Sequence, residues 1–174
     1  GGFMVYRTND GKTGALDYRE KAPLAASKNM YLDENGDIIE GKSTIGSMAV
    51  GIPGTIAGIF EAQKRFGKLD VAAILKPVIK LAKNGYIITE KQEYRIEHYD
   101  SLITAVNEKE ILYNQKLKAG DNLINLALAE TLQRIALNGR DEFYKGETAK
   151  KLVNYLQAKG SIITLEDLAK YEAK

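Results

Sequence analysis

Four dipeptides that end in glycine divide most of this chain into helical segments: Phe66-Gly67, Asn84-Gly85, Asn138-Gly139 and Lys159-Gly160. Glycine takes the left-handed backbone conformation at little cost, and that conformation commonly ends a helix. Each dipeptide therefore predicts a helix C-terminus with glycine in the left-handed conformation. Residues 47–174 are expected to fold as a series of helices joined by short loops.

Several of these helices also have clear starting points. Thr89 with Gln92, and Thr164 with Asp167, have the spacing of a capping box. In such a box the side chain of each residue accepts a hydrogen bond from the backbone N–H of the other. The first box predicts a polar helix to about Val106. Other helices are expected after the glycine-rich stretch 51–58 (ending at residue 66), after Asp70 (residues 71–84, with Pro77 inside), over the apolar run 123–137, and from Glu147 to residue 159.

Residues 1–46 instead show strand and turn patterns. Segments 3–7 and 14–18 flank an Asn-Asp-Gly turn, which predicts a β-hairpin. Segments 30–32 and 38–39 repeat the pattern around an acidic turn, 33–37. The alternating Asp33, Asn35 and Asp37 also suggest a calcium loop, but the glycine stands at the fourth loop position and Thr44 occupies the place of the bidentate glutamate. The turn interpretation is preferred.

Composition excludes several classes of function. The chain has 174 residues, of which 44% are hydrophobic and 28% charged, as expected for one soluble globular domain. Its 25 basic and 23 acidic residues are mixed along the chain, so no nucleic-acid partner is expected. Without cysteine there is no disulfide, thiolate zinc site or cysteine nucleophile. No window has the apolar length of a membrane span, and no membrane association is expected.

The segment 17–23, Asp-Tyr-Arg-Glu-Lys-Ala-Pro, holds the one side chain with an assignable chemical task. The planar fork of donors on Arg19 matches a carboxylate in a bidentate way. Asp17 and Glu20 flank it and either hold the fork in place or neutralise it. The residues alone favour a local salt-bridge cluster over a ligand site.

No catalytic machinery is evident in the chain. The single histidine, His98, lies in the polar helix predicted after Thr89 and is expected to be exposed, and one histidine cannot build a metal site. The serines at 27, 43, 47 and 101 lack the context of a nucleophile elbow. The glycines at 51–58 lack the P-loop lysine, so we expect them to let a helix start pack closely against neighbouring backbone. Neither a metal nor a cofactor is expected.

Seven motifs occur together in one order. They are Gly-Gly-Phe-Met (1–4), Asp-Tyr-Arg-Glu-Lys-Ala-Pro (17–23), Met-Tyr-Leu-Asp (30–33), Ala-Val-Gly-Ile-Pro-Gly-Thr-Ile-Ala-Gly (49–58), Lys-Leu-Ala-Lys-Asn-Gly-Tyr (80–86), Asp-Glu-Phe-Tyr-Lys-Gly (141–146) and Ile-Thr-Leu-Glu-Asp-Leu (163–168). As an ordered set they resemble the large subunit of the γ-glutamyltransferases, also called γ-glutamyl transpeptidases.

The resemblance implies an α+β fold that is part of the αββα sandwich of an N-terminal-nucleophile hydrolase. Because the chain begins at Gly1 without an initiator methionine and ends in a helical pattern at Lys174, we interpret it as an internal piece of the large subunit. It is expected to be a single partial domain, 1–174, with a strand and hairpin part (1–46) and a helical part (47–174). The nucleophile implied by the family is a threonine at the start of the small subunit, outside this chain.

The resemblance also implies roles and partners. Arg19 stands where the family binds the α-carboxylate of the γ-glutamyl group, and Glu20 follows it as the family pattern expects. The implied reaction cleaves γ-glutamyl amide bonds and transfers the γ-glutamyl group to amino acids, peptides or water. The expected partners are the small subunit of the same precursor and a donor such as glutathione. The isolated chain is expected to be inactive and to self-associate, and the parent protein to be extracytoplasmic.

Two alternatives stay open from the sequence. The chain could belong to a relative with the same scaffold, a capsule poly-γ-glutamate depolymerase or a cephalosporin acylase. The Asp-Tyr-Arg-Glu motif favours a γ-glutamyl donor but does not separate a transferase from the depolymerase. The second alternative is a non-catalytic helical docking segment with no ligand of its own.

Overall fold

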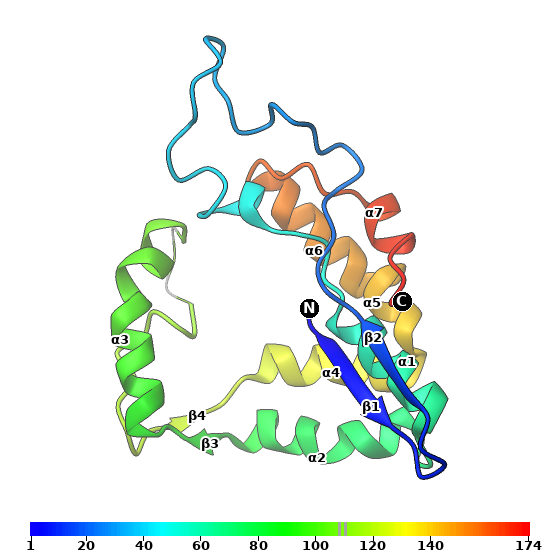
Figure 1. Cartoon of the computed structure of the whole chain (residues 1–174). Helices are drawn as coiled ribbons and strands as arrows, with labels where there is room; N and C mark the ends of the chain where they lie inside the picture. Colours follow the sequence, from blue (N-terminus) through cyan, green and yellow to red (C-terminus); the bar gives the residue numbers. More distant parts are fainter. Residues whose placement is uncertain (108, 110) are drawn as a thin grey trace. The chain divides into compact units, whose positions relative to one another are not determined.

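The computed structural model describes residues 1–107, 109 and 111–174. Its elements are β1 (Phe3–Arg7), β2 (Thr13–Asp17), the 3-10 helix η1 (Ser47–Ala49), α1 (Thr55–Phe66), α2 (Val71–Asn84), β3 (Tyr86–Ile87), α3 (Glu90–Ala105), β4 (Asn122–Leu123), α4 (Leu126–Asn138), α5 (Arg140–Tyr144), α6 (Glu147–Ala158) and α7 (Leu165–Ala169). Figure 1 labels the strands and the α-helices. Within the described residues, no helix is long and apolar enough to cross a membrane.

The chain forms two compact units. Unit 1 consists of Gly1–Ala73 and Arg134–Lys174, and unit 2 of Ile74–Gln133. The boundary expected at residue 46 separates strand-rich from helix-rich sequence and does not coincide with the division between the units. Helices α2 and α4 each contain one of the unit boundaries.

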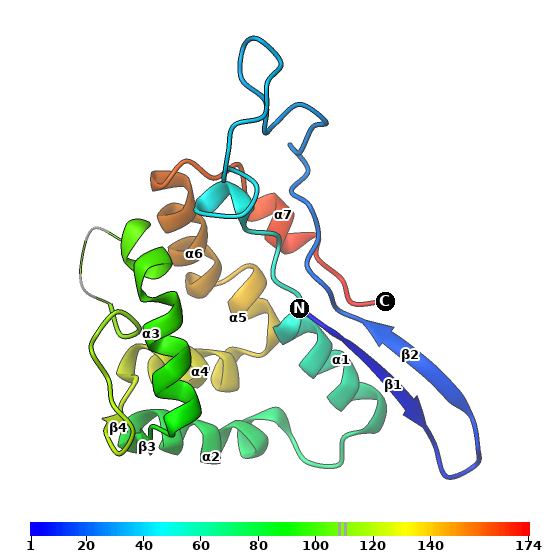
Figure 2. The ribbon, with the colours of Figure 1, turned by 60° about the vertical axis from the view of Figure 1, so that its left-hand side comes forward.

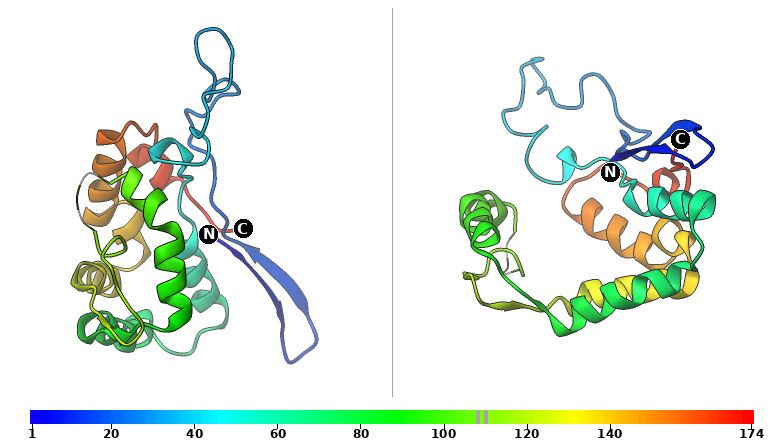
Figure 3. Two further views of the ribbon diagram at one scale, coloured as in Figure 1. Left: turned by 90° about the vertical axis from the view of Figure 1, so that its left-hand side faces the viewer. Right: turned by 60° about the horizontal axis from the view of Figure 1, so that its bottom comes forward.

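Strands β1 and β2 form the predicted hairpin in unit 1. They pair antiparallel from Phe3 opposite Asp17 to Arg7 opposite Thr13. The Thr8 N–H donates to the Lys12 carbonyl at 2.8 Å and closes the connection between the strands. The outer edge of β2 is also paired at its end, because Asp17 and Lys174 exchange backbone hydrogen bonds of 2.7 and 2.8 Å. Figures 2 and 3 show the C-terminus beside this end of β2.

The second predicted hairpin is reduced to one antiparallel bridge, between Leu32 and Ile38. The prediction of two strands there was therefore wrong. Ile38 is 80% exposed, so little apolar packing supports a longer ladder. The acidic turn is held by Asp33, whose carboxylate accepts hydrogen bonds from the N–H groups of Asn35 and Asp37, both at 2.9 Å.

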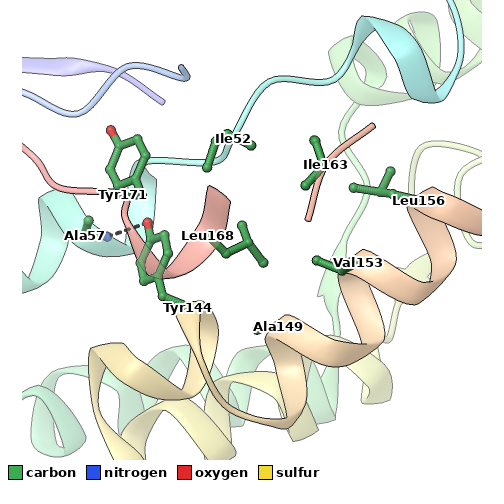
Figure 4. Close-up of a cluster of buried hydrophobic side chains, with 9 residues drawn as sticks. All are labelled: Ile52, Ala57, Tyr144, Ala149, Val153, Leu156, Ile163, Leu168 and Tyr171. Carbon is green, nitrogen blue, oxygen red and sulfur yellow. Dashed lines mark hydrogen bonds between the residues drawn. The ribbon is translucent and has the colours of Figure 1, made fainter. Parts of the chain in front are cut away.

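The core of unit 1 is built where α1, α5, α6 and α7 meet (Figure 4). Its buried members are Ile52, Ala57, Tyr144, Ala149, Val153, Leu156, Ile163, Leu168 and Tyr171. The Tyr144 hydroxyl donates to the Pro53 carbonyl at 2.8 Å and accepts from the Ala57 N–H at 3.1 Å. It thus satisfies the start of α1, whose N-cap residue Gly54 has no side chain to do so. Burial raises the pKa of Tyr144 to about 12.

Two buried carboxylates cap helices in unit 1. Asp167 accepts from the N–H and hydroxyl of Thr164 at 2.7 and 2.8 Å, which confirms the predicted capping box, and also from the Leu24 N–H at 2.6 Å. Glu142 accepts from the N–H and hydroxyl of Thr148 at 3.1 and 2.9 Å, at the start of α6. Burial acts to raise the pKa of Glu142, but these bonds and the charge of Arg134 outweigh it and lower the pKa overall.

Three of the four predicted glycine helix ends are confirmed. Gly85, Gly139 and Gly160 have φ of 84°, 74° and 89°. The prediction for Gly67 was wrong, because its φ is −73° with extended ψ. There the Gln63 carbonyl accepts the Gly67 N–H at 2.6 Å and the Gln63 side chain donates to the Leu69 carbonyl at 2.7 Å. This clamp joins α1 to α2 without a left-handed residue.

Unit 2 contains the short β3–β4 ladder and α3. Tyr86 pairs with Leu123, so Leu123 belongs to a strand and the predicted helix over 123–137 begins three residues later, at Leu126. The predicted capping box at the start of α3 is confirmed, with both the Thr89 and Gln92 side chains accepting the partner's backbone N–H. Ile88 and Leu123 are buried.

Candidate functional site

Arg19 lies two residues beyond the end of β2. The preceding residue, Tyr18, still pairs with Gly2 through two backbone hydrogen bonds of 2.8 and 3.2 Å. The Arg19 N–H donates to the Asp17 side chain at 2.9 Å. The local sequence therefore ends the strand with a tight side-chain turn, and this turn brings Arg19 out of the hairpin.

The Arg19 side chain is 60% exposed and forms an ion pair with its neighbour. Its Nη2 donates to Glu20 Oε1 at 2.8 Å. That hydrogen bond lowers the pKa of Glu20 and raises the pKa of Arg19, so both groups are charged at neutral pH. Within the described residues, Nε and Nη1 of Arg19 have no hydrogen-bond partner. A carboxylate binds a guanidinium in a bidentate way through Nη2 together with either Nε or Nη1, and Nη2 has a second hydrogen beside the one that it donates to Glu20, so one such edge of the fork stays open.

The backbone of Arg19 is fixed from the C-terminal end of the chain. The Tyr171 hydroxyl donates to the Arg19 carbonyl at 2.6 Å. Gly54 lies against the same point: a Cβ there would stand 2.1 Å from the Tyr18 carbonyl oxygen and 2.0 Å from the Tyr171 hydroxyl. The expectation that the glycines of 51–58 allow close packing against neighbouring backbone is thereby confirmed.

An open cavity of about 210 Å³ is lined by Glu20, the residue that follows Arg19, but not by Arg19 itself. The rest of the lining is mostly apolar and comes from residues 21–51, among them Pro23, Met30 and Met48. A larger open cavity of about 520 Å³ in unit 1, lined by Phe60, Glu61 and other residues, includes neither Arg19 nor Glu20. The exposed guanidinium of Arg19 can therefore bind an anion, while the apolar cavity begins at the next residue, Glu20.

The remaining sequence candidates do not join this site. His98 is exposed on α3 in unit 2, where it stacks on Tyr94 with ring centroids 5.9 Å apart. Ser47 donates its hydroxyl hydrogen to the Lys159 carbonyl at 2.6 Å. In the described part of the chain, no group of three or more His, Cys, Asp or Glu residues is placed to hold a metal ion.

Tyr171 is the residue at this site that sequence reasoning missed. It stands 152 positions after Arg19. The only local signal was the capping box at Thr164, which predicted the short helix before it but not its partner. Nothing in the sequence pattern relates Tyr171 to the hairpin.

Comparison with known proteins gives one consistent result. The family model described as Gamma-glutamyltranspeptidase matches residues 1–174. The glutathione hydrolase proenzyme of Pseudomonas aeruginosa is 45% identical over 176 residues, which cover 100% of this chain and 31% of that protein. The chain thus spans about a third of the length of this curated relative.

Two solved structures have the same fold over the whole chain. The Helicobacter pylori γ-glutamyltranspeptidase is 36% identical with a TM-score of 0.94, and the alignment covers 51% of that chain. The Pseudomonas nitroreducens γ-glutamyltranspeptidase, in complex with L-DON, is 42% identical with a TM-score of 0.90 and the same coverage. These similarities confirm the predicted fold class, α+β and part of an N-terminal-nucleophile hydrolase.

Proposed function

Because the chain belongs to the γ-glutamyltranspeptidase family, we propose that it is the donor-binding part of a γ-glutamyltransferase. The parent protein cleaves γ-glutamyl amide bonds of glutathione-like donors and transfers the γ-glutamyl group to amino acids, peptides or water. The nucleophile is the N-terminal threonine of a small subunit from the same precursor, outside these 174 residues. The description of the Pseudomonas aeruginosa relative as a proenzyme supports a processed precursor.

One observation carries the proposal: the Arg19 guanidinium is exposed, its Nε and Nη1 have no hydrogen-bond partner among the described residues, and Nη2 uses only one of its two hydrogens on Glu20. A γ-glutamyl donor has an α-carboxylate, and two parallel N–H···O bonds to it fix both its position and its plane. The ion pair with Glu20 restricts the guanidinium to one side of the site. Glu20 is therefore a positioning residue, and Arg19 is the group that contacts the substrate.

This contact supplies orientation and not bond breaking. Holding the α-carboxylate at one end of the γ-glutamyl group directs its γ-carbonyl to a fixed point, where the threonine of the small subunit attacks it. In the assembled enzyme, binding in this orientation makes the attack of the threonine on the γ-carbonyl effectively unimolecular. A change at Arg19 is accordingly expected to act mainly on KM for the donor.

A partner subunit also fits the surface of the hairpin. Phe3 and Val5 of β1 are 66% and 77% exposed. The side of β1 away from β2 has no strand partner among the described residues. Such an edge with apolar side chains favours pairing with another strand, from the small subunit in the parent or from a second copy in the isolated chain.

Donor assays on the parent protein test the proposal directly. Glutathione, poly-γ-glutamate and a glutaryl β-lactam are offered in parallel, with and without a dipeptide acceptor. Turnover of glutathione, increased by the acceptor, is the expected result. Turnover of poly-γ-glutamate alone identifies a depolymerase, and turnover of the glutaryl β-lactam alone an acylase. Either result contradicts the proposal.

A complementation assay separates an enzyme part from a docking segment. The isolated chain is expected to release no chromophore from a γ-glutamyl anilide. Mixed with the rest of the precursor, produced separately, it is expected to restore turnover. If the mixture stays inactive while the intact parent is active, the result counts against the proposal that this chain binds the donor and docks on the rest of the precursor.

A further inference from the structure

We propose that Tyr171 is a positioning residue for Arg19, in that its hydroxyl fixes the Arg19 backbone and so the direction in which the guanidinium reaches the donor. This inference rests on the proposed function of Arg19 as the ligand of the donor's α-carboxylate. It assigns to the C-terminal segment of the chain a specific part in substrate recognition.

The geometry that carries the proposal is a short hydrogen bond donated by a buried side chain. The Tyr171 hydroxyl donates to the Arg19 carbonyl at 2.6 Å, and Tyr171 is 1% exposed. Its ring stacks on Tyr144 with centroids 5.6 Å apart and planes at 11°. Two stacked rings in a packed core hold the hydroxyl to one position.

Cations on both sides add to this rigidity. Arg140 donates to the Tyr171 carbonyl, and its guanidinium carbon lies 4.3 Å from the Tyr144 ring centroid. The Lys21 ammonium lies 4.6 Å from the Tyr171 ring centroid and donates to the Glu172 carbonyl at 2.7 Å. The ring of Tyr171 and the two carbonyl groups that follow it, those of Tyr171 and Glu172, are therefore both anchored.

The hydroxyl is a donor at all physiological pH values. Burial raises the pKa of Tyr171, and the negative charges of Asp17 and Glu20 raise it further. The hydroxyl lies where a Cβ on Gly54 would come within 2.0 Å of it, which leaves no room for a substituent at that position. The bond to Arg19 is thus preserved by both protonation and packing.

Both main-chain polar groups of Arg19 are consequently fixed. The N–H is held by the Asp17 carboxylate and the carbonyl by Tyr171. Rotation of the backbone at Arg19 is restrained, so the guanidinium is aimed by its own torsions and by Glu20 alone. A loss of the carbonyl bond frees the peptide plane and spreads the guanidinium over more positions, which weakens an oriented bidentate contact.

The test is Tyr171→Phe in the parent enzyme, which keeps the stacked ring and removes only the hydroxyl. We expect KM for a γ-glutamyl anilide to rise about fivefold, the effect of one lost hydrogen bond, with kcat within about twofold. The matched control is Tyr144→Phe, which removes a hydroxyl from the same stack but leaves the bond between Tyr171 and Arg19. Its KM is expected to stay within about twofold of wild type, although thermal stability falls as well.

A double-mutant cycle with Arg19→Lys distinguishes positioning from a general structural role. If Tyr171 acts through the arginine fork, Tyr171→Phe adds little to KM in the Arg19→Lys background. An equal rise in both backgrounds overturns the inference. So does an unchanged KM in Tyr171→Phe when Arg19→Lys raises it. A wild-type parent that cleaves no γ-glutamyl donor instead overturns the proposed function, and this inference with it.

Discussion

The ring of Tyr18 packs directly on Gly58, so closely that a Cβ at Gly58 would stand 2.3 Å from the Tyr18 Cγ. Gly58 is buried in the first half of α1, and Tyr18 immediately precedes Arg19. Helix α1 and the end of the hairpin are thus in contact at Tyr18, the residue next to Arg19. The position of Arg19 depends on this absence of a side chain.

Gly58→Ala is predicted to destabilise the protein by about 1–3 kcal/mol, because the methyl group overpacks a filled site and outweighs the better helix propensity of alanine. Chemical denaturation measures the change in the free energy of unfolding. Thr55→Ala is the control, since Thr55 is exposed on the same helix and its substitution should change stability by less than about 0.5 kcal/mol. A Gly58→Ala variant as stable as this control would show that Tyr18 is free to move away.

Asp167→Asn is predicted to cost about 1–3 kcal/mol at neutral pH. An amide has one acceptor oxygen, whereas the Asp167 carboxylate accepts from Leu24 on one oxygen and from Thr164 on the other. At least one buried donor is therefore left without an acceptor. Thermal unfolding at pH 7 measures the loss, and Glu166→Gln, on the exposed side of α7, is the control.

The Asp167 carboxylate also predicts that the stability of the protein depends on pH. Burial acts to raise the pKa of Asp167, but the hydrogen bonds from Leu24 and Thr164 outweigh it and lower the pKa below 3.8. A lowered folded-state pKa gives stability that is present above pH 3.8 and lost as the pH falls through the folded value. Stability of the wild type should therefore fall more steeply below pH 3.8 than that of Asp167→Asn. Parallel curves for the two proteins would contradict this assignment.

The raised pKa of Tyr144 predicts that the stability of the protein changes at alkaline pH. Its pKa is raised by burial to about 12, above the value of 10.0 for an exposed tyrosine. The protonated form is favoured by folding, so its contribution is complete below pH 10 and is lost as the pH rises towards 12. Tyr144→Phe should be less stable than wild type by about 1 kcal/mol at pH 8, since the Pro53 carbonyl and Ala57 N–H lose their partner. The difference should narrow between pH 10 and 12, as followed by circular dichroism.

In unit 2, the capping box of α3 gives a local prediction. Thr89→Ala removes the side-chain acceptor of the Gln92 N–H and is expected to cost about 1 kcal/mol. Hydrogen exchange at the first amides of α3 should accelerate correspondingly. Thr104→Ala, in the last turn of the same helix, is the control and should leave those amides unchanged.

The features that were predicted correctly from the sequence are those that depend on residues close together in the chain. Both capping boxes and three glycine helix ends are set by residues within one turn of each other, and the structure confirms them. The exception, Gly67, ends its helix in an extended conformation because the Gln63 side chain reaches forward to Leu69. A side-chain clamp of this kind has no spacing signature.

Long-range partners explain the other differences. Leu123 reads as the first residue of an apolar helix but pairs with Tyr86, far earlier in the chain. The ion pair of Arg19 with Glu20 follows from their adjacency, whereas the contact of Arg19 with Tyr171 spans 152 positions. The ion pair of Arg19 was therefore predictable from adjacent residues, but the residue that holds its backbone carbonyl was not.

Steady-state kinetics of Arg19→Lys in the parent enzyme test the central claim most directly. Lysine keeps the charge and loses the bidentate fork, so KM for a γ-glutamyl donor is predicted to rise about tenfold or more, with a smaller change in kcat. Arg7→Lys, an exposed arginine on β1 of the same hairpin, is the control and should leave KM unchanged. A KM near the wild-type value in Arg19→Lys would contradict the assignment of Arg19 as the ligand of the donor's α-carboxylate.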